Sequence, residues 1–244
     1  LIGLVPRRVT DADDVAGLDH HAGSPVEGIH QRQALADVGI GAAREASPDS
    51  QPFVHRARHE VGAVIAPLPR LQAEDELAAI NMIIGSSYGG TPALTATSGP
   101  GLSLMIEALG LATAAEIPVV VVDVMRGGPS TGIPTKSEQT DLNIAIYGLH
   151  GDAPHLVLAP QSVGDCLFTT QWATYLAETL QAPAIVLSDQ FMGQSRAAIE
   201  RPADVAFIGV RTVASSISGT YKRYALASNG VSPMALPGTP GGQY

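Results

Sequence analysis

Apolar residues fall into short blocks from residue 71 onward, and most blocks have the length of one strand or one helix. The clearest block is 119–122, an unbroken run of valines. A β-branched run without polar alternation favours a central parallel strand covered on both faces, which we place at 118–124. Shorter apolar runs predict three more strands, at 93–97, 155–159 and 184–188.

The stretches around these strands have the composition of helices, which we place at 72–85, 102–115, 137–147 and 162–181. The first of them begins with acidic residues, which the positive end of a helix dipole favours. Its main apolar stripe is expected to consist of Leu77, Ile80 and Ile84. Strands that alternate with helices predict an α/β fold with a doubly wound, mostly parallel sheet and right-handed crossovers.

Two of these helices carry capping signals at their starts. Ser137 is expected to cap the helix at 137–147. Ser162 and Asp165 resemble a capping box in which Asp replaces Glu.

The strand order also predicts where a ligand would bind, because open parallel sheets bind ligands outside the carboxyl ends of their strands. The loops TSGPG (97–101) and RGGPSTG (126–132) follow consecutive strands, so we expect them on one rim. Arg126 and several hydroxyls suit an anion there. Alternatively, RGGPSTG is only a connection in which Arg126 is solvated or ion-paired, since it matches neither the GxGxxG nor the GxxxxGK[ST] pattern.

Composition narrows the classes of function. The formal net charge of −9 and the pI near 5.1 argue against a nucleic-acid partner, which requires a basic face. No apolar run approaches the length of a membrane span, and the opening residues are too short for a signal peptide, so we expect no membrane and a cytoplasmic location. The single cysteine, Cys166, excludes an internal disulfide and an iron–sulfur cluster held by this chain alone.

Residues 1–70 differ from the rest of the chain. They hold five of the seven histidines and seven of the twelve arginines, but no lysine and no methionine. The pairs His20–His21 and His55–His59 have spacings that metal ligands use, yet no cysteine or acidic cluster supports either pair, so we predict no metal site. We expect an atypical segment at 1–70, disordered or misread, an α/β domain at 71–200, and a linker with the start of a truncated following domain at 201–244.

Four long motifs occur in one order: TATSGPGLSLMIEALGLA, DVMRGGPSTGIPTKSEQTDL, YGLHGDAPHLVLAPQS and YALASNGVSPMALPG. With them the chain resembles the α subunit of 2-oxoacid:ferredoxin oxidoreductases, and among these the 2-oxoglutarate branch. The resemblance covers about 72–244.

The resemblance implies a thiamine diphosphate enzyme that oxidatively decarboxylates a 2-oxo acid to an acyl-CoA and reduces ferredoxin. It implies that this chain is the domain that binds the pyrimidine ring of the cofactor. A β subunit would hold the diphosphate with its Mg²⁺, and iron–sulfur clusters would also lie on the partner subunit.

The resemblance also implies roles for individual residues. Glu74, in QAEDE, matches the catalytic glutamate that hydrogen-bonds the pyrimidine ring, whereas from the pattern alone it is a solvated acid at a helix start. Thr97, Ser98 and Gly99 match the loop beside the ring. Arg126 matches an arginine near the substrate carboxylate, which a guanidinium would bind at two points.

Two histidines have motif positions without an implied catalytic role. His150, in LHGD, is expected to be a buried structural residue. His155 stands where members of the family commonly carry arginine, and we interpret it as a tolerated surface change.

The chain also departs from the family. Nothing in 1–70 matches the substrate-binding YPITPS-type loop, and no EHDE-like segment follows the last motif, so we expect an α subunit that is incomplete at both ends. Two alternatives remain: a catalytically inactive remnant that at most binds a partner, and an unrelated nucleotide-binding α/β protein that uses RGGPSTG as an anion loop.

Overall fold

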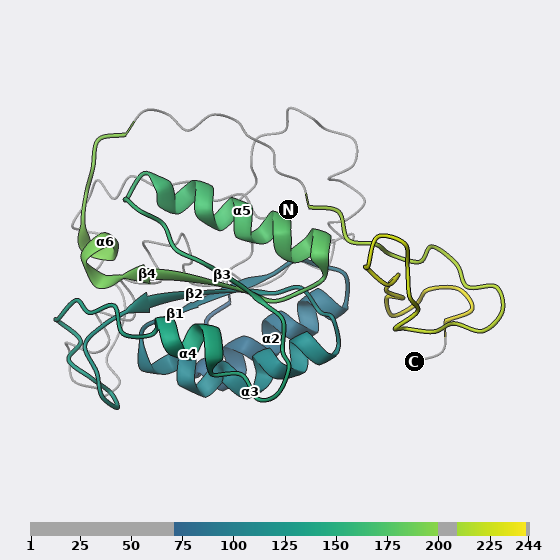
Figure 1. Ribbon diagram of the computed structural model, residues 1–244, viewed down its shortest axis with the longest axis horizontal. Helices are drawn as coiled ribbons and strands as arrows, with labels where there is room; N and C mark the ends of the chain where they lie inside the picture. Colours follow the sequence, from purple (N-terminus) through teal and green to yellow (C-terminus); the bar gives the residue numbers. More distant parts are fainter. Residues whose placement is uncertain (1–70, 200–208, 243–244) are drawn as a thin grey trace.

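The computed structural model describes residues 71–199 and 209–242 of the chain. The described strands are β1 (Leu94–Thr97), β2 (Val120–Met125), β3 (Leu156–Leu158) and β4 (Ala184–Asp189). The described helices are α2 (Glu76–Tyr88), α3 (Pro100–Ala114), α4 (Leu142–Tyr147), α5 (Asp165–Leu180) and α6 (Gln190–Gln194). Figure 1 shows these elements as one layered body, with a loop-rich extension at its right-hand end.

The four strands form one sheet in the order β1-β2-β4-β3, and every neighbouring pair is parallel. All residues of β2 and β4 are buried. This confirms the prediction of a central strand covered on both faces. β1 and β3 form the two edges of the described sheet. All four predicted strands are present, within two residues of their expected ends.

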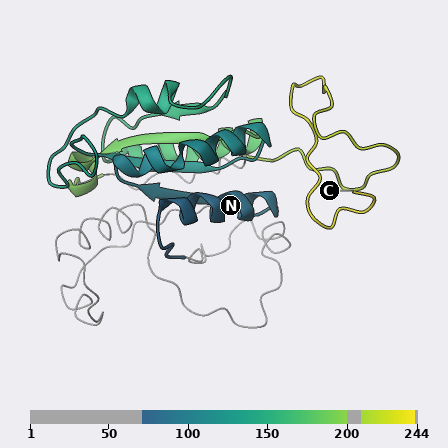
Figure 2. The same cartoon turned by 90° about the horizontal axis from the view of Figure 1, so that it is seen from below.

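Helices cover both faces of the sheet: α2, α3 and α4 lie below it in Figure 1 and α5 lies above it. Figure 2 shows the molecule from below, the side of α2, α3 and α4. The side chains of β2 alternate between the two layers. Val119, Val121 and Met125 belong to the core on the side of α2 and α3. Val120 and Val122 pack in a second core with residues of α5. The predicted α/β fold with a doubly wound parallel sheet is therefore confirmed.

The first helix begins later than predicted, and it buries a different stripe. α2 begins at Glu76, because the carboxylate of Asp75 accepts the N–H of Ala78 at 2.7 Å and caps the helix there. Leu77, which we expected in the apolar stripe, is 51% exposed. Ile83 is buried in its place, together with Ile80 and Ile84.

The predicted helix at 137–147 is half as long as expected. α4 begins at Leu142, with Asp141 at its N-cap position, so Ser137 does not cap it. Residues 134–141 are irregular, because Glu138 and Gln139 hydrogen-bond parts of the fold outside any helix.

The capping box predicted before α5 forms only in part, because α5 begins at Asp165 with Gly164 at the N-cap position and no side-chain cap. The N–H of Asp165 donates to the Ser162 hydroxyl at 3.2 Å, and the Asp165 carboxylate accepts the N–H of Gln161 at 2.9 Å. The short helix α6 follows β4 directly. Asp189 caps α6 by accepting the N–H of Met192 at 2.7 Å.

The segment 209–242 is irregular, as predicted for most of it, and it lies at the end of the sheet opposite to α6 (Figure 1). Arg211 joins it to the body through what we call the Arg211 clamp, which consists of Ser87, Glu178 and Arg211. The guanidinium donates to the Glu178 carboxylate at 2.8 and 3.0 Å, to the Ser87 hydroxyl at 3.0 Å and to the Ser87 carbonyl oxygen.

Several predictions concern residues outside the described part of the chain. They include the atypical segment 1–70 and both histidine pairs. The proposed domain limits at 70 and 200 remain predictions. In the described ranges, no helix has both the length and the apolar character required to cross a membrane.

Candidate functional site

Two glycine-rich loops meet at the carboxyl ends of β1 and β2, which lie side by side in register, with Thr97 opposite Asp123. TSGPG follows β1 and opens α3, and RGGPSTG follows β2. Their meeting point is Gly99, where φ is +50°, and a Cβ at this position would lie 3.0 Å from Cγ of Arg126. The predicted shared rim of these two loops is therefore present.

Thr97 is buried at the end of β1, and its hydroxyl donates to the carboxylate of Glu76 at 3.4 Å. Gly101 lies against both side chains, since a Cβ there would overlap the Thr97 hydroxyl and would lie 2.8 Å from a carboxylate oxygen of Glu76. Ser98 is half-buried, and its carbonyl oxygen accepts the N–H of Gly101 at 3.3 Å. The loop thus brings a half-buried carboxylate to the start of α3.

The carboxylate that reaches this loop is that of Glu76 and not that of Glu74. Glu76 is in the first turn of α2, which packs against α3. Glu74 is exposed in the bend before the helix, and it makes no hydrogen bond or ion pair with any residue that the structure describes. The sequence motif QAEDE contains both glutamates, and from the resemblance we assigned the catalytic role to the first of them, Glu74.

Arg126 is half-buried at the base of the second loop. Its terminal NH₂ donates to the carbonyl oxygen of Thr131 at 2.8 Å. Its Nε is buried and has no hydrogen-bond partner among the described residues. A buried guanidinium N–H without an acceptor is costly, and it indicates an acceptor that joins the site from elsewhere.

RGGPSTG folds back on itself and binds a carboxylate of its own chain. The N–H of Gly128 donates to Glu138 at 2.9 Å, and the N–H of Gly127 donates to the carbonyl oxygen of Lys136 at 2.8 Å. At Gly132 φ is +68°, and a Cβ there would overlap the carbonyl oxygen of Gly127, so this turn requires glycine. The predicted anion loop is thus partly occupied by Glu138, which our interpretation of the sequence missed.

The same loop is also fixed to the end of β4. The amide of Gln139 donates to the carboxylate of Asp189 at 2.6 Å, and the amide of Gln190 donates to the carbonyl oxygen of Pro134. These contacts connect residues 50 and 56 positions apart in the sequence. No local pattern predicts such contacts, because they arise only when the sheet brings β2 and β4 together.

A third carboxyl group lies beneath both loops. Asp123 is fully buried within β2, and neither of its carboxylate oxygens has a hydrogen bond of good geometry to a described residue. Burial, and next the nearby carboxylate of Asp141, raise the pKa of Asp123 well above its usual value. The guanidinium of Arg126 lowers this pKa but does not outweigh burial.

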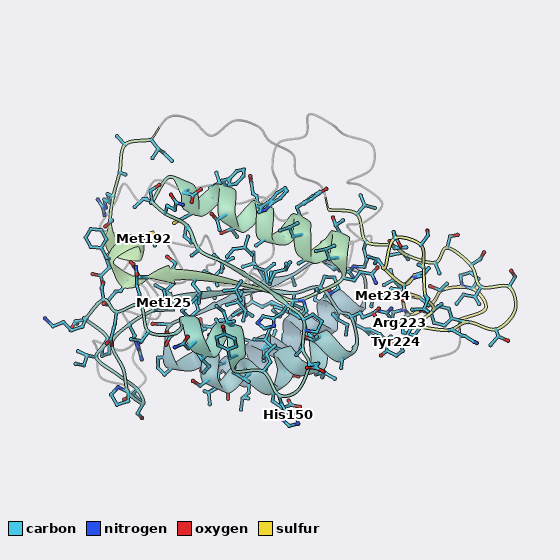
Figure 3. The ribbon with its side chains drawn as sticks, viewed as in Figure 1. Met125, His150, Met192, Arg223, Tyr224 and Met234 are labelled. Carbon is cyan, nitrogen blue, oxygen red and sulfur yellow. The ribbon has the colours of Figure 1, made fainter. Side chains whose placement is uncertain are left out.

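His150 does not belong to this site. We expected a buried histidine, but His150 is exposed, and Figure 3 places it well away from Met125, the last residue of β2. A separate open hollow of about 420 Å³ lies between the end of α4 and the start of β3. Its lining residues fall within 146–155, so neither glycine-rich loop contributes to it.

The described residues contain no group of three or more histidine, cysteine, aspartate or glutamate side chains that could hold a metal ion. The described part of the rim offers the half-buried Glu76 carboxylate, the buried Thr97 hydroxyl and the Arg126 guanidinium, whose Nε has no hydrogen-bond partner among the described residues.

Comparisons with known proteins agree with the motifs. The family described as "Pyruvate flavodoxin/ferredoxin oxidoreductase, thiamine diP-bdg" matches residues 49–237. Over 171 residues the chain is 42% identical to the 2-oxoglutarate oxidoreductase subunit KorA of Mycobacterium tuberculosis, covering 70% of this chain and 26% of that protein. Over 132 residues it is 51% identical to the 2-oxoglutarate synthase subunit KorA of Archaeoglobus fulgidus, covering 54% of this chain and 38% of that protein.

One solved structure is similar in both sequence and fold. It is described as the 2-oxoglutarate:ferredoxin oxidoreductase from Magnetococcus marinus with 2-oxoglutarate, coenzyme A and succinyl-CoA bound. The identity is 51% and the TM-score 0.67, over 72% of this chain and 31% of that one. The chain thus spans less than two fifths of the length of each of these relatives. The resemblance inferred from the motifs is confirmed.

Proposed function

Because this chain belongs to the pyruvate flavodoxin/ferredoxin oxidoreductase family of thiamine diphosphate-binding domains, we propose that it is the pyrimidine-binding part of a 2-oxoacid:ferredoxin oxidoreductase α subunit. The observation that carries this proposal is the Glu76 carboxylate beside Thr97 at the TSGPG loop. The similar solved enzyme is described with 2-oxoglutarate, coenzyme A and succinyl-CoA bound. We therefore take 2-oxoglutarate as the substrate and its acyl-CoA as the product.

The residues at the rim fit an aminopyrimidine ring. Such a ring needs a carboxylate that accepts a hydrogen bond from its protonated nitrogen, in a place protected from water. Glu76 is half-buried, and it is held between Thr97 and Gly101. When bound, thiamine diphosphate supplies the electron sink that decarboxylation of a 2-oxo acid requires. The role of this chain is to position Glu76, whose carboxylate would hold a proton on the ring.

Arg126 suits the carboxylate of the substrate. The aliphatic part of its side chain lies against Gly99 in the TSGPG loop. The guanidinium edge that carries Nε has no hydrogen-bond partner among the described residues. A carboxylate bonded at this edge would satisfy the buried N–H and would be fixed in orientation, as arginine forks typically do. We propose that Thr97, Ser98 and Gly99 contact the cofactor and that Arg126 binds the substrate.

The remaining parts of the reaction are assigned to partners. The β subunit would hold the diphosphate, its Mg²⁺ and the iron–sulfur clusters, and reduced ferredoxin would leave from there. Coenzyme A and the 2-oxo acid are the proposed small-molecule partners, and the cytoplasm is the proposed location. The single cysteine of this chain is the observation that favours clusters on another subunit.

The test compares two glutamates in the enzyme complex purified with its partner subunit. We expect Glu76→Gln to reduce 2-oxoglutarate-dependent, CoA-dependent reduction of ferredoxin by about 10²-fold or more, which is the typical loss when a proton-transferring group is removed. Glu74→Gln is the matched control, because it makes the same change two residues away at an exposed side chain. It is expected to retain activity within about twofold.

Three other outcomes have clear meanings. Loss of activity in Glu74→Gln alone would return the catalytic role to Glu74, as the motif match implied. Full activity in both variants would overturn the cofactor role of this loop. A wild-type complex that binds its partner but turns over no 2-oxo acid would favour the inactive remnant.

A further inference from the structure

Asp123 is a fully buried acid within a strand whose other residues are all apolar. An ionised carboxylate that is buried without hydrogen bonds is destabilising by several kcal/mol in real proteins, so such a group requires an explanation. Neither oxygen of Asp123 has a good hydrogen bond to a described donor. The simplest explanation is that Asp123 carries a proton and donates a hydrogen bond of its own.

A suitable acceptor lies beside it. Asp141 occupies the N-cap position of α4, but its side chain makes no capping bond to the helix. Its carboxylate instead acts on that of Asp123, and its Oδ2, like both oxygens of Asp123, is buried without a hydrogen-bond partner among the described residues. Two carboxyl groups can form a hydrogen bond only if one of them carries a proton.

The surroundings of the two carboxyl groups determine which of them holds the proton. Burial, together with the negative charge of Asp141, raises the pKa of Asp123 far above the usual carboxyl value, while the N–H of Gly99 and the charge of Arg126 act in the opposite direction. The pKa of Asp141 is also raised by burial and by Glu138, but the bond from Asp123 lowers it. Asp123 is therefore the proton donor and Asp141 the ionised acceptor.

The pair connects the two loops of the candidate site. Asp123 is opposite Thr97 in the sheet, and Arg126 directly follows the end of the same strand. Residues 126–141 connect β2 to α4, and Asp141 is the last of them. The bond between Asp123 and Asp141 therefore fixes the end of this connection to β2. We propose that Asp123 and Asp141 share one proton and act as positioning residues, holding Arg126 and the TSGPG loop in their relative places. This role in the reaction rests on the proposed function, whereas the shared proton does not.

A shared proton has a definite sign in the dependence of stability on pH. The folded chain keeps a proton on Asp123 that the unfolded chain releases above about pH 4. The stability that this proton contributes is therefore fully present below the ordinary carboxyl pKa, and it is lost as the pH rises through the higher pKa of folded Asp123. In Asp123→Asn the amide donates to Asp141 at every pH, so this slope is removed.

The first experiment measures the melting temperature of the full chain from about pH 5 to pH 8. We expect the melting temperature of Asp123→Asn, relative to wild type, to rise by up to about 3–5 °C per pH unit. The reason is that release of one proton on unfolding changes the free energy of unfolding by about 1.4 kcal/mol per pH unit. The control is Asp152→Asn, which makes the same change at an exposed aspartate. Its curve should run parallel to that of the wild type.

Equal slopes for Asp123→Asn and wild type would overturn the shared proton. If Asp123→Asn does not fold, infrared spectroscopy of the wild type decides instead. We expect the carbonyl band of a protonated carboxylic acid at neutral pH, and its absence would also overturn the proposal. Neither readout depends on thiamine diphosphate or on activity.

The positioning role is tested separately in the enzyme complex. Asp123→Ala should raise KM for the 2-oxo acid at least tenfold with a smaller change in kcat, because Arg126 loses its support. In Asp123→Asn, KM for the 2-oxo acid should stay close to the wild-type value. Equal losses in both variants would overturn the positioning role. A pH slope with no turnover in the wild-type complex would instead count against the proposed function and leave the shared proton intact.

Discussion

At the scale of single residues, the site depends on a glycine at a position where no side chain would fit. Gly101 is in the first turn of α3, and any side chain there would occupy the place of the Thr97 hydroxyl and the Glu76 carboxylate. Nine residues along the same helix, Gly110 has nothing within 4 Å of the position that a Cβ would occupy. The two glycines therefore differ in their surroundings while sharing their helical backbone.

We expect Gly101→Ala to separate Glu76 from Thr97, destabilise the chain by about 1–3 kcal/mol through overpacking, and weaken binding of thiamine diphosphate by the complex. Gly110→Ala is the matched control, and it should stabilise α3 by about 0.5–1 kcal/mol because alanine favours a helix more than glycine does. Urea unfolding measures both effects. A Gly101→Ala chain as stable as Gly110→Ala would contradict the packing described for this turn.

At the scale of elements, His155 connects the end of α4 to the start of β3. Its Nδ1 lies 2.7 Å from the carbonyl oxygen of Ala153 and its Nε2 lies 2.6 Å from that of Ala145. Both neighbours are acceptors, so both bonds form only when each ring nitrogen carries a proton. The surface role that we expected for His155 is wrong, because the residue is half-buried and bonded on both sides.

Replacement of His155 tests this connection. His155→Leu leaves the carbonyl oxygens of Ala145 and Ala153 without their donor, and we expect it to lower the free energy of unfolding by about 1–3 kcal/mol. His155→Arg supplies several donors and is expected to lose less. The measurement is urea unfolding at pH 6, and equal stabilities for the leucine variant and wild type would contradict the two bonds.

Local pattern predicted the elements better than it predicted their ends. The valine run of β2 and the apolar run of β4 were sufficient to place the strands, because complete burial leaves a continuous apolar signal. The predicted start of α4 was wrong, since Glu138 bonds back to Gly128 in its own loop and Gln139 bonds to Asp189, which only the folded sheet brings near. Asp123 was missed as a site residue for the same reason: its partner Asp141 is 18 positions away, and no sequence motif links them.

At the scale of the whole molecule, the Arg211 clamp joins the segment 209–242 to helices on both sides of the sheet. Arg211 and Glu178 are both buried, with side-chain exposures of 5% and 9%. Glu178 belongs to α5 and Ser87 to α2, which cover opposite faces. One guanidinium thus connects three parts of the fold that are distant in the sequence.

Removal of the arginine should be costly, because it leaves the Glu178 carboxylate buried and unpaired. We expect Arg211→Met to lower the free energy of unfolding by about 3–5 kcal/mol. The double variant Arg211→Met with Glu178→Met should recover much of that loss, since it removes the stranded charge. Lys222→Met changes an exposed cation of the same segment and serves as the control. Additive losses in the double variant would contradict the clamp.

The same clamp has a consequence for the time course of folding. Its contact between Ser87 and Arg211 closes a loop of 124 residues, whereas most contacts within a β-α unit are local. Ordering so long a loop is unfavourable until the sheet exists, so the clamp is expected to form after the rate-limiting step. Interactions that form after this step slow unfolding and leave the refolding rate almost unchanged. Arg211 therefore governs how long a folded molecule survives more than how quickly it forms.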